Sequence, residues 1–159
     1  MHNAEYFPTK PRYGERRISD KEYDELRKHT PSRKIRQKVN ENNVIGADDP
    51  AIPGKKIEGS LEADHIVSMD KIAKMENFDN LSTENQIKVL NYEENFTGLS
   101  KSSNTSKGAK SYSEWTTYKK ENIPISMEYK AEMMKKESAL EPVLQGMIDG
   151  LLKEQGVKS

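Results

Sequence analysis

A chain of 159 residues, of which only 33% are hydrophobic and whose mean hydropathy is −0.97, has room for one domain with a modest core. The absence of cysteine excludes disulfides and thiolate zinc sites, and no apolar run approaches the roughly 18 residues that a membrane span requires. The net charge is zero, but the charged residues are unevenly distributed. Residues 10–40 contain 11 Lys or Arg and 5 Asp or Glu, residues 41–94 contain 5 and 12, and residues 99–120 contain 5 and 1.

This charge pattern bears on the partners of the protein. Two basic segments flank an acidic one, so the basic faces would attract a polyanion such as nucleic acid. The alternative is that the basic and acidic segments neutralise each other within the fold. The N-terminus lacks the apolar core of a signal peptide, and we therefore expect a chain without membrane contact or an export address of its own.

The first part of the chain predicts two short helices and a long loop. Residues 1–18 are expected to be irregular, and the capping box Ser-Asp-Lys-Glu at 19–22 starts a helix. Thr30-Pro31 supplies an N-cap and a first-turn proline for a second helix over 31–42. Residues 43–60 are rich in Gly and Pro and predict a loop.

Two strands and a polar turn are predicted in the middle of the chain. Strands are expected at 60–68 and at 95–100, where short apolar stretches include β-branched residues or phenylalanine. Residues 100–111, rich in Ser and Lys, predict a polar turn that leads into a helix.

Three helices are predicted after the first strand. One covers 82–90 with Ser82 as its N-cap, and another covers 111–118 after a second capping box. The longest covers 126–155 and ends at Gly156. Its predicted apolar face consists of Met127, Met133, Met134, Leu140, Val143, Leu144, Met147, Ile148 and Leu151.

The adjacent Asp64 and His65 are candidates for a catalytic site. Hydrolysis of a phosphodiester needs an activated water, and a neutral imidazole can take the proton from that water at neutral pH. The Asp64 carboxylate and the Asn104 carbonyl are hard oxygen ligands of the kind that Mg²⁺ prefers. The alternatives are a structural role for His65, a helix-capping role for Asn104 and a solvated surface position for Lys107.

The stretches Asp-His-Ile-Val at 64–67 and Asn-Phe-Thr-Gly-Leu-Ser-Lys-Ser-Ser-Asn-Thr-Ser-Lys at 95–107 resemble the HNH, or ββα-metal, nuclease family. That family has an Asp-His or His-His pair on a first strand, an Asn near a second strand and an Asn or His on a helix. The spacing of nine from Asn95 to Asn104 is similar to that of the HNH domains of CRISPR effector nucleases. The resemblance covers roughly residues 58–112.

The resemblance implies an α+β, mostly helical fold. Its ββα-metal core, a short two-stranded hairpin plus a helix, would occupy about 58–112, with added N- and C-terminal helices. Residues 19–159 would form a single nuclease domain. The separation of His65 from Asn95 is longer than in compact members and implies an inserted helix at 82–91.

The resemblance also implies a role for each matching residue. Asp64 falls on the metal-ligand carboxylate and His65 on the general base. Asn95 falls on the structural Asn that braces the loop and orients the base, Asn104 on the second metal ligand, and Lys107 on a basic residue that contacts phosphate. The cofactor would be one divalent ion, with Mg²⁺ expected and Mn²⁺, Ni²⁺ or Zn²⁺ as alternatives.

A second resemblance concerns the flanking sequence. Four stretches look like the C-terminal nuclease domains of bacterial polymorphic toxins: residues 18–42, "DDP" at 48–50 with a glycine after it, "EADHIVSM" at 62–69 and "SKGAKSYSEW" at 106–115. The partners implied are double-stranded DNA and a cognate immunity protein, with a monomer acting in the bacterial cytoplasm. The alternatives are a phage or mobile-element HNH endonuclease and a non-catalytic nucleic-acid-binding module on the same scaffold.

A basic helix completes the predicted nucleic-acid interface. On the helix predicted at 31–42, Ile35 and Val39 share one face and should pack inward, which leaves the cations at the surface. The predicted sequence-independent phosphate contacts are Arg33, Lys34, Arg36, Lys38, Lys101, Lys107 and Lys110.

Overall fold

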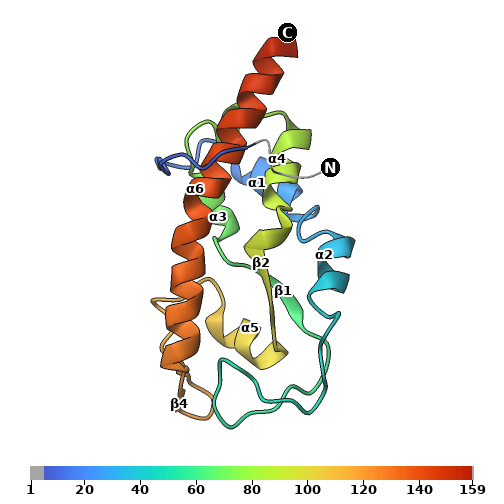
Figure 1. The fold of residues 1–159 in the computed structure, drawn as a ribbon, viewed down its shortest axis with the longest axis vertical. Coiled ribbons are helices and arrows are strands. Elements are labelled where there is room, and N and C mark those ends of the chain that lie inside the picture. The colour runs from blue at the N-terminus through green and yellow to red at the C-terminus, as the bar shows by residue number, and fades with distance from the viewer. Residues whose placement is uncertain (1–5, 159) are drawn as a thin grey trace. The chain divides into compact units, whose positions relative to one another are not determined.

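The computed structural model describes residues 6–158, which form an α+β, mostly helical fold (Figure 1). The helices are α1 (Asp20–Arg27), α2 (Arg33–Lys38), α3 (Met69–Ala73), α4 (Thr83–Leu90), α5 (Lys101–Lys107) and α6 (Met127–Lys158), with 3-10 helices η1 (Phe78–Asn80) and η2 (Glu93–Asn95). The strands are β1 (Glu62–His65), β2 (Phe96–Leu99), β3 (Thr117–Tyr118) and β4 (Ile123–Pro124), in two antiparallel pairs, β1–β2 and β3–β4. The predicted α+β, mostly helical class is confirmed, and the ββα-metal core stays a prediction.

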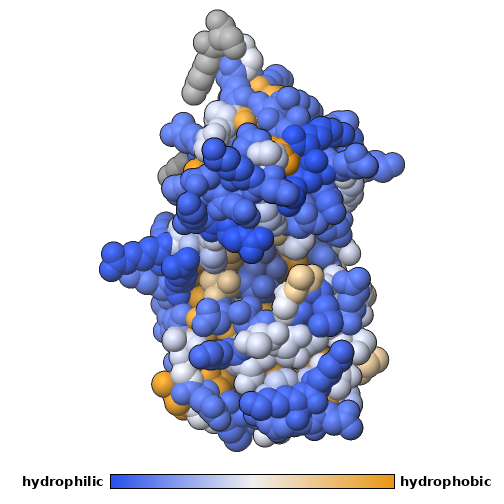
Figure 2. Space-filling model, turned by 180° about the vertical axis from the view of Figure 1, so that it is seen from behind, coloured by the Kyte–Doolittle hydropathy of each residue, from blue (hydrophilic) through white to orange (hydrophobic). Residues whose placement is uncertain are grey.

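Two further observations concern the chain as a whole. No helix within residues 6–158 combines the length and the apolar character that a membrane crossing needs. The face seen in Figure 2 is mostly hydrophilic, as the low mean hydropathy leads one to expect.

The chain divides into two compact units, each described by itself. The first unit combines 1–32, 67–95 and 138–159, and the second combines 33–66 and 96–137. The single domain expected at 19–159 stays a prediction. Of the segment expected to be irregular, residues 1–5 lie outside the described residues, and 6–18 contain no helix.

The first unit is held by an apolar core under α1, α3, α4 and the second half of α6. The cluster contains Ile18, Tyr23, Leu26, Val67, Met69, Ile72, Ala73, Met75, Phe78, Leu81, Val89, Leu90, Leu144, Met147, Ile148 and Leu151. These residues alternate with charged ones at helical spacing, so each helix turns one apolar stripe inward. The hydrophobic effect is therefore the main stabilising term of this unit.

The helix-start signals of the first unit are mostly confirmed. Ser19 accepts a hydrogen bond from the Glu22 amide at 3.1 Å and forms the predicted capping box. Ser82 likewise caps α4 at the Asn85 amide. The predicted Thr30 cap is wrong, because the Thr30 hydroxyl is buried and donates to the Leu90 carbonyl at 2.8 Å. The second helix therefore starts at Arg33.

The second unit places α5 on the β1–β2 pair. The pairing register runs from Glu62↔Leu99 to His65↔Phe96, and α5 contacts both strands. The Asp49 carboxylate, 5% exposed, accepts hydrogen bonds from the Ser100 and Ser103 hydroxyls. This ties the start of α5 to the predicted loop at 43–60.

Two predictions around α5 are wrong. Residues 100–111, expected to be a polar turn, contain α5, because Ser100 caps the Ser103 amide at 3.0 Å and the helix continues to Lys107. The second capping box does form, with hydrogen bonds between Ser111 and Glu114 in both directions, yet it closes a turn. Residues 117–118 pair with β4 and so leave the predicted helix.

The long C-terminal helix is confirmed, with corrections at its ends. α6 begins at Met127 and continues through Gly156, so this glycine does not end it. Met127 and Met134 are 81% and 41% exposed, which removes them from the predicted apolar face. Met133 is buried, since consecutive residues of a helix are rotated by about 100° and Met133 therefore faces a different direction from Met134.

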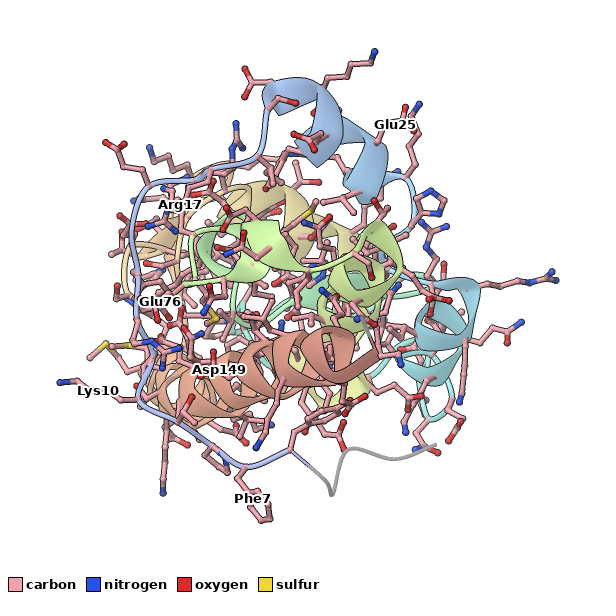
Figure 3. All side chains as sticks on the ribbon, turned by 90° about the horizontal axis from the view of Figure 1, so that it is seen from above. Phe7, Lys10, Arg17, Glu25, Glu76 and Asp149 are labelled. Carbon is pink, nitrogen blue, oxygen red and sulfur yellow. The ribbon has the colours of Figure 1, made fainter. Side chains whose placement is uncertain are left out.

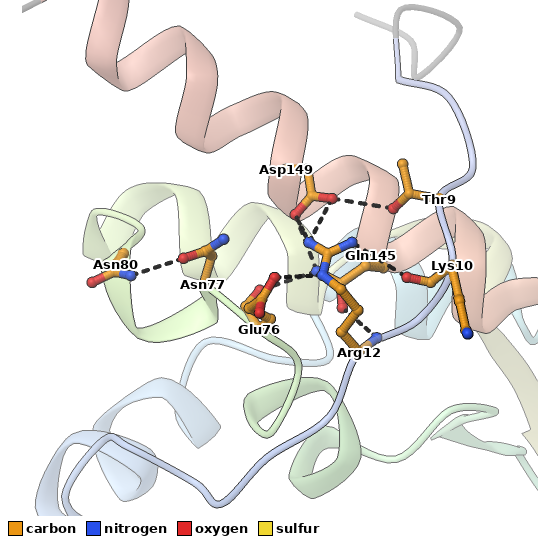
Figure 4. A network of polar contacts seen from close by, with 8 residues as sticks. All are labelled: Thr9, Lys10, Arg12, Glu76, Asn77, Asn80, Gln145 and Asp149. Carbon is orange, nitrogen blue, oxygen red and sulfur yellow. Dashed lines mark hydrogen bonds and ion pairs between the residues drawn. The ribbon is translucent and has the colours of Figure 1, made fainter.

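Residues 6–12, called the N-terminal strap, run along the second half of α6 (Figure 3). Arg12 Nη2 donates to both Asp149 carboxylate oxygens, at 2.7 and 2.8 Å, and Nε donates to Glu76 (Figure 4). The hydrogen bonds that Arg12 donates to Asp149, and then those to Glu76, raise the pKa of Arg12. Gly146 lies where the strap comes closest, and a Cβ there would be 1.7 Å from the Phe7 carbonyl oxygen.

Replacing Gly146 by alanine should destabilise the first unit. The added methyl group meets backbone that cannot rotate away, and overpacking of this kind typically costs about 1–3 kcal/mol. Chemical denaturation measures the loss. Gly156→Ala in the same helix is the control, since its Cβ meets nothing within 4 Å and alanine favours the helix. Equal stability of the two variants would contradict the close approach.

Candidate functional site

Asp64 and His65 are the last two residues of β1. Successive side chains of a strand point to opposite faces, and the two side chains accordingly meet different neighbours. The Asp64 carboxylate faces Tyr112 and Lys107, whereas the His65 ring contacts the Phe96 ring at a centroid distance of 4.3 Å. The strand geometry therefore extends to His65, which is opposite Phe96 in the register.

The Asp64 carboxylate is held by two donors through one oxygen. Oδ2 accepts a hydrogen bond from the Tyr112 hydroxyl at 3.1 Å and lies 3.3 Å from the Lys107 ammonium nitrogen. The side chains of Asp64 and Lys107 are 17% and 7% exposed. A carboxylate with two fixed donors has a fixed orientation, which is how proteins aim a carboxylate at a ligand.

Lys107 is the buried cation of this cluster. It lies in the last turn of α5, where a positive charge is favourable to the helix dipole. Its Nζ is 4.6 Å from the centroid of the Tyr112 ring, so the aromatic face shares the charge with Asp64. The Lys107 ammonium points toward Asp64. A contact between Lys107 and phosphate stays a prediction.

Sequence reasoning missed Tyr112. The side chain is fully buried, and burial, followed by the charge of Asp64, raises its pKa, so the neutral phenol is the hydrogen-bond donor. No spacing motif marks this residue, because its place depends on the non-helical turn at 111–114. Tyr129 packs edge-on against Tyr112 with ring centroids 6.1 Å apart.

Asn95 makes a two-point contact with the backbone that follows β1. Its Oδ1 accepts from the Val67 amide at 2.8 Å, and its Nδ2 donates to the Val67 carbonyl at 3.0 Å. The side chain is completely buried. These hydrogen bonds are of the kind that a bracing asparagine makes, and its action on the base stays a prediction.

Asn104 lies inside α5 and is half-buried. Ser100 is the N-cap of α5, and no helix starts at 111, so a capping role for Asn104 is excluded. Asn104 precedes Lys107 by three residues, which makes the two side chains neighbours on the helix surface. A metal ligand at Asn104 stays a prediction.

The predicted surface cations are exposed. Ile35 is 2% exposed and holds the inner face of α2, as predicted. The predicted phosphate contacts that are exposed are Arg33, Lys34, Arg36 and Lys38 on α2, Lys101 on α5 and Lys110 after it. Lys107 alone of the predicted set is buried, and phosphate contacts by the exposed cations stay a prediction.

The two predicted oxygen donors, the Asp64 carboxylate and the Asn104 amide, are of the chemical type that a hard divalent ion takes. Within the described part of the chain, no three His, Cys, Asp or Glu side chains gather, so a site built from those residues alone is not present there. Both contacts of Asp64 are made by Oδ2, and Oδ1 is the oxygen on which a cation would bind. Mg²⁺ takes few protein ligands and keeps several waters, so one carboxylate and one amide oxygen suffice.

The structure thus brings together Asp64 and Lys107 from the predicted set and adds Tyr112. His65 lies next to Asp64 in β1, and Asn104 next to Lys107 in α5. The chain matches no family model, no curated protein and no solved structure. Any proposal about its function therefore rests on the residues of the chain itself.

Lys107→Met should destabilise the second unit strongly. Removing one partner leaves a buried charge without compensation, which costs about 3–5 kcal/mol. A double-mutant cycle with Asp64→Asn, measured by urea unfolding, should give a coupling of about 1–3 kcal/mol. Lys110→Met, at an exposed position, is the control and should stay within about 0.5 kcal/mol of the wild type. Additive effects of Asp64→Asn and Lys107→Met would argue against the pair.

Tyr129 should make the folded state sensitive to alkali. Burial is the largest cause that raises its pKa to about 12, and the charge of Asp64 acts in the same direction. An unfolded tyrosine loses its proton near pH 10, so the folded state binds more protons between pH 10 and 12, and stability falls as pH rises through that window.

Tyr129→Phe should therefore match the wild type at pH 8 and lose less stability than the wild type above pH 10. The difference should grow by up to about 1.4 kcal/mol per pH unit. Denaturant titrations at several pH values measure it. Parallel alkaline profiles would show that Tyr129 does not titrate with folding.

Proposed function

We propose that the chain is a metal-dependent endonuclease of the HNH type that hydrolyses phosphodiester bonds of DNA. The observation that carries this proposal is an order of elements: an antiparallel strand pair, β1–β2, is followed at once by α5, which packs on both strands. Asp64 and His65 end the first strand, and Asn104 lies on the helix. This is the order that a ββα-metal core requires.

His65 is the general base in this proposal. Its contact with Phe96 limits the rotation of the ring, and a positioned imidazole loses less entropy when it takes a proton from water. The Asn95 contact with Val67 fixes the backbone two residues beyond His65. Both features support a histidine that is held in one orientation.

Asp64 and Asn104 would hold the divalent ion. When bound, the ion supplies Lewis-acid stabilisation of the phosphate and of the leaving oxygen. Tyr112 and Lys107 orient the carboxylate through Oδ2, and Lys107 adds positive charge close to the place where negative charge develops on the phosphate.

The biological setting follows from the sequence resemblance alone. A nuclease domain of a bacterial polymorphic toxin would act on double-stranded DNA in the cytoplasm and would bind an immunity protein. A phage or mobile-element endonuclease would share the chemistry and lack that partner.

One observation favours a second function. The charge of Asp64 is already balanced by Lys107 at 3.3 Å, so this carboxylate does not require a metal ion for its burial. A non-catalytic nucleic-acid-binding module on the same scaffold would keep such a pair for stability alone. Cleavage separates the two functions.

Plasmid cleavage with Mg²⁺ or Mn²⁺, compared with EDTA, tests the proposal. His65→Ala should lower the rate by about 10²–10⁴, the range typical of the loss of a general base. His29→Ala, an exposed position in the first unit, is the matched control and should cleave like the wild type. Binding of DNA without cleavage under any metal would favour the non-catalytic module, and full activity of His65→Ala would remove the base.

A further inference from the structure

A basic groove lies between α5 and the β3–β4 hairpin of the second unit. Its volume is about 500 Å³. The charged side chains that line it are Lys101, Lys110, Lys119, Lys120 and Glu58. Four cations thus face one carboxylate, in a chain whose net charge is zero.

The four lysines are not used by the fold. All four are exposed, and none makes an ion pair within residues 6–158. Lys101 is also the first residue of α5, where a cation is unfavourable to the helix dipole, and no acidic residue follows in that turn. Helix stability therefore does not account for Lys101, whereas an anionic ligand would.

The rest of the lining indicates what kind of anion fits. Ser102 and Thr105 add hydroxyl donors of the kind that contact phosphate oxygens. The aromatic residue of the lining is Tyr118, which is 6% exposed and so offers no open face for a base. Proteins that grip single strands stack bases on aromatic rings, and this groove provides charge and hydroxyls instead.

The groove continues into a second hollow. That hollow, of about 330 Å³, shares Glu58, Lys101 and Ser102 with the first. The second hollow adds Lys56 and Glu62, whose charges cancel, so the two hollows together keep an excess of cations. An open track of this kind suits an extended polymer better than a small phosphorylated molecule, which a closed pocket would surround.

The groove is on the side of α5 away from the Asp64 cluster. Ser103 and Lys107, one turn apart, form the buried face of the helix, whereas Lys101 and Thr105, also one turn apart, are exposed and line the groove. A strand bound in the groove would therefore contact the protein at phosphates other than the one cleaved.

We propose that this groove binds the phosphodiester backbone of duplex DNA at a flanking position and without reading its sequence. The proposal rests on the proposed nuclease function for the choice of DNA, and it adds Lys119 and Lys120 as contacts. Because the groove is remote from the Asp64 cluster, it sets the affinity for DNA and leaves the chemical step unchanged.

Binding of a labelled DNA duplex in EDTA, followed by fluorescence anisotropy over a range of salt, tests the proposal. Lys119→Ala with Lys120→Ala should raise Kd by about tenfold or more at 0.1 M salt and flatten the slope of log K against log salt by about 1.8, which is 0.9 for each lost contact. Lys101→Ala with Lys110→Ala should do the same from the other wall.

Two controls sharpen the measurement. Glu58→Gln removes the one carboxylate of the groove and should lower Kd, an effect opposite in sign to that of the lysine variants. Lys135→Ala with Lys136→Ala, two adjacent exposed lysines of α6 outside the groove, should keep the wild-type slope. A wild-type slope in both groove variants, equal losses in the Lys135 and Lys136 control, or tighter binding of the single strand would each overturn the proposal.

Cleavage separates this proposal from the nuclease assignment. In single-turnover reactions at saturating DNA, Lys119→Ala with Lys120→Ala should cleave at the wild-type rate and differ only in the concentration needed. Lysine-dependent binding without cleavage would leave the groove in place and remove the nuclease. Cleavage with unchanged affinity in the lysine variants would remove the groove and leave the nuclease.

Discussion

The burial of the Lys107 ammonium is the constraint on which the second unit depends. An ammonium taken out of water needs a partner, and Asp64 is the carboxylate that lies against it. This pair fixes α5 to β1, and the Tyr112 hydroxyl and ring complete the surroundings of both charges. The hydrogen bond from Tyr112 to Asp64 also holds the turn at 111–114 in place.

The two units are stabilised in different ways. The first unit buries aliphatic and aromatic side chains from four helices, and the polar side chains that it buries, Thr30, Gln86, Asn95 and Gln145, are neutral. The second unit buries charged groups, with Asp49 on the serines that begin α5 and Lys107 on Asp64. Polar burial specifies geometry strictly, because each buried group must find its partner.

Local signals in the sequence predicted those parts of the fold that depend on local contacts. The caps at Ser19 and Ser82 act within one helical turn and were read correctly. Thr30 and Ser111 are also residues of the N-cap type, yet partners far away in the sequence decide the structure around them. The Thr30 hydroxyl donates to the Leu90 carbonyl, and residues 117–118, which follow Ser111, pair with β4.

The candidate site shows the same division. Asp64, His65 and Asn104 are predicted from the spelling and spacing of motifs that resemble the HNH family, and their roles stay predictions. Tyr112 could not be found in this way, because its contact with Asp64 depends on a buried charge pair that no sequence period reveals.

The long connection between β1 and β2 has a consequence for folding. The two strands that carry the candidate site are neighbours in space but are separated along the chain by residues 66–95, which contain α3 and α4. Closing such a loop costs entropy before any strand pairing returns free energy. Helices that form inside the loop shorten its effective length, and the Asn95 contact with Val67 joins its two ends. The site is therefore expected to assemble late, after the inserted helices, so that the folding of α3 and α4, which contain none of the candidate site residues, limits the rate at which a competent site is formed.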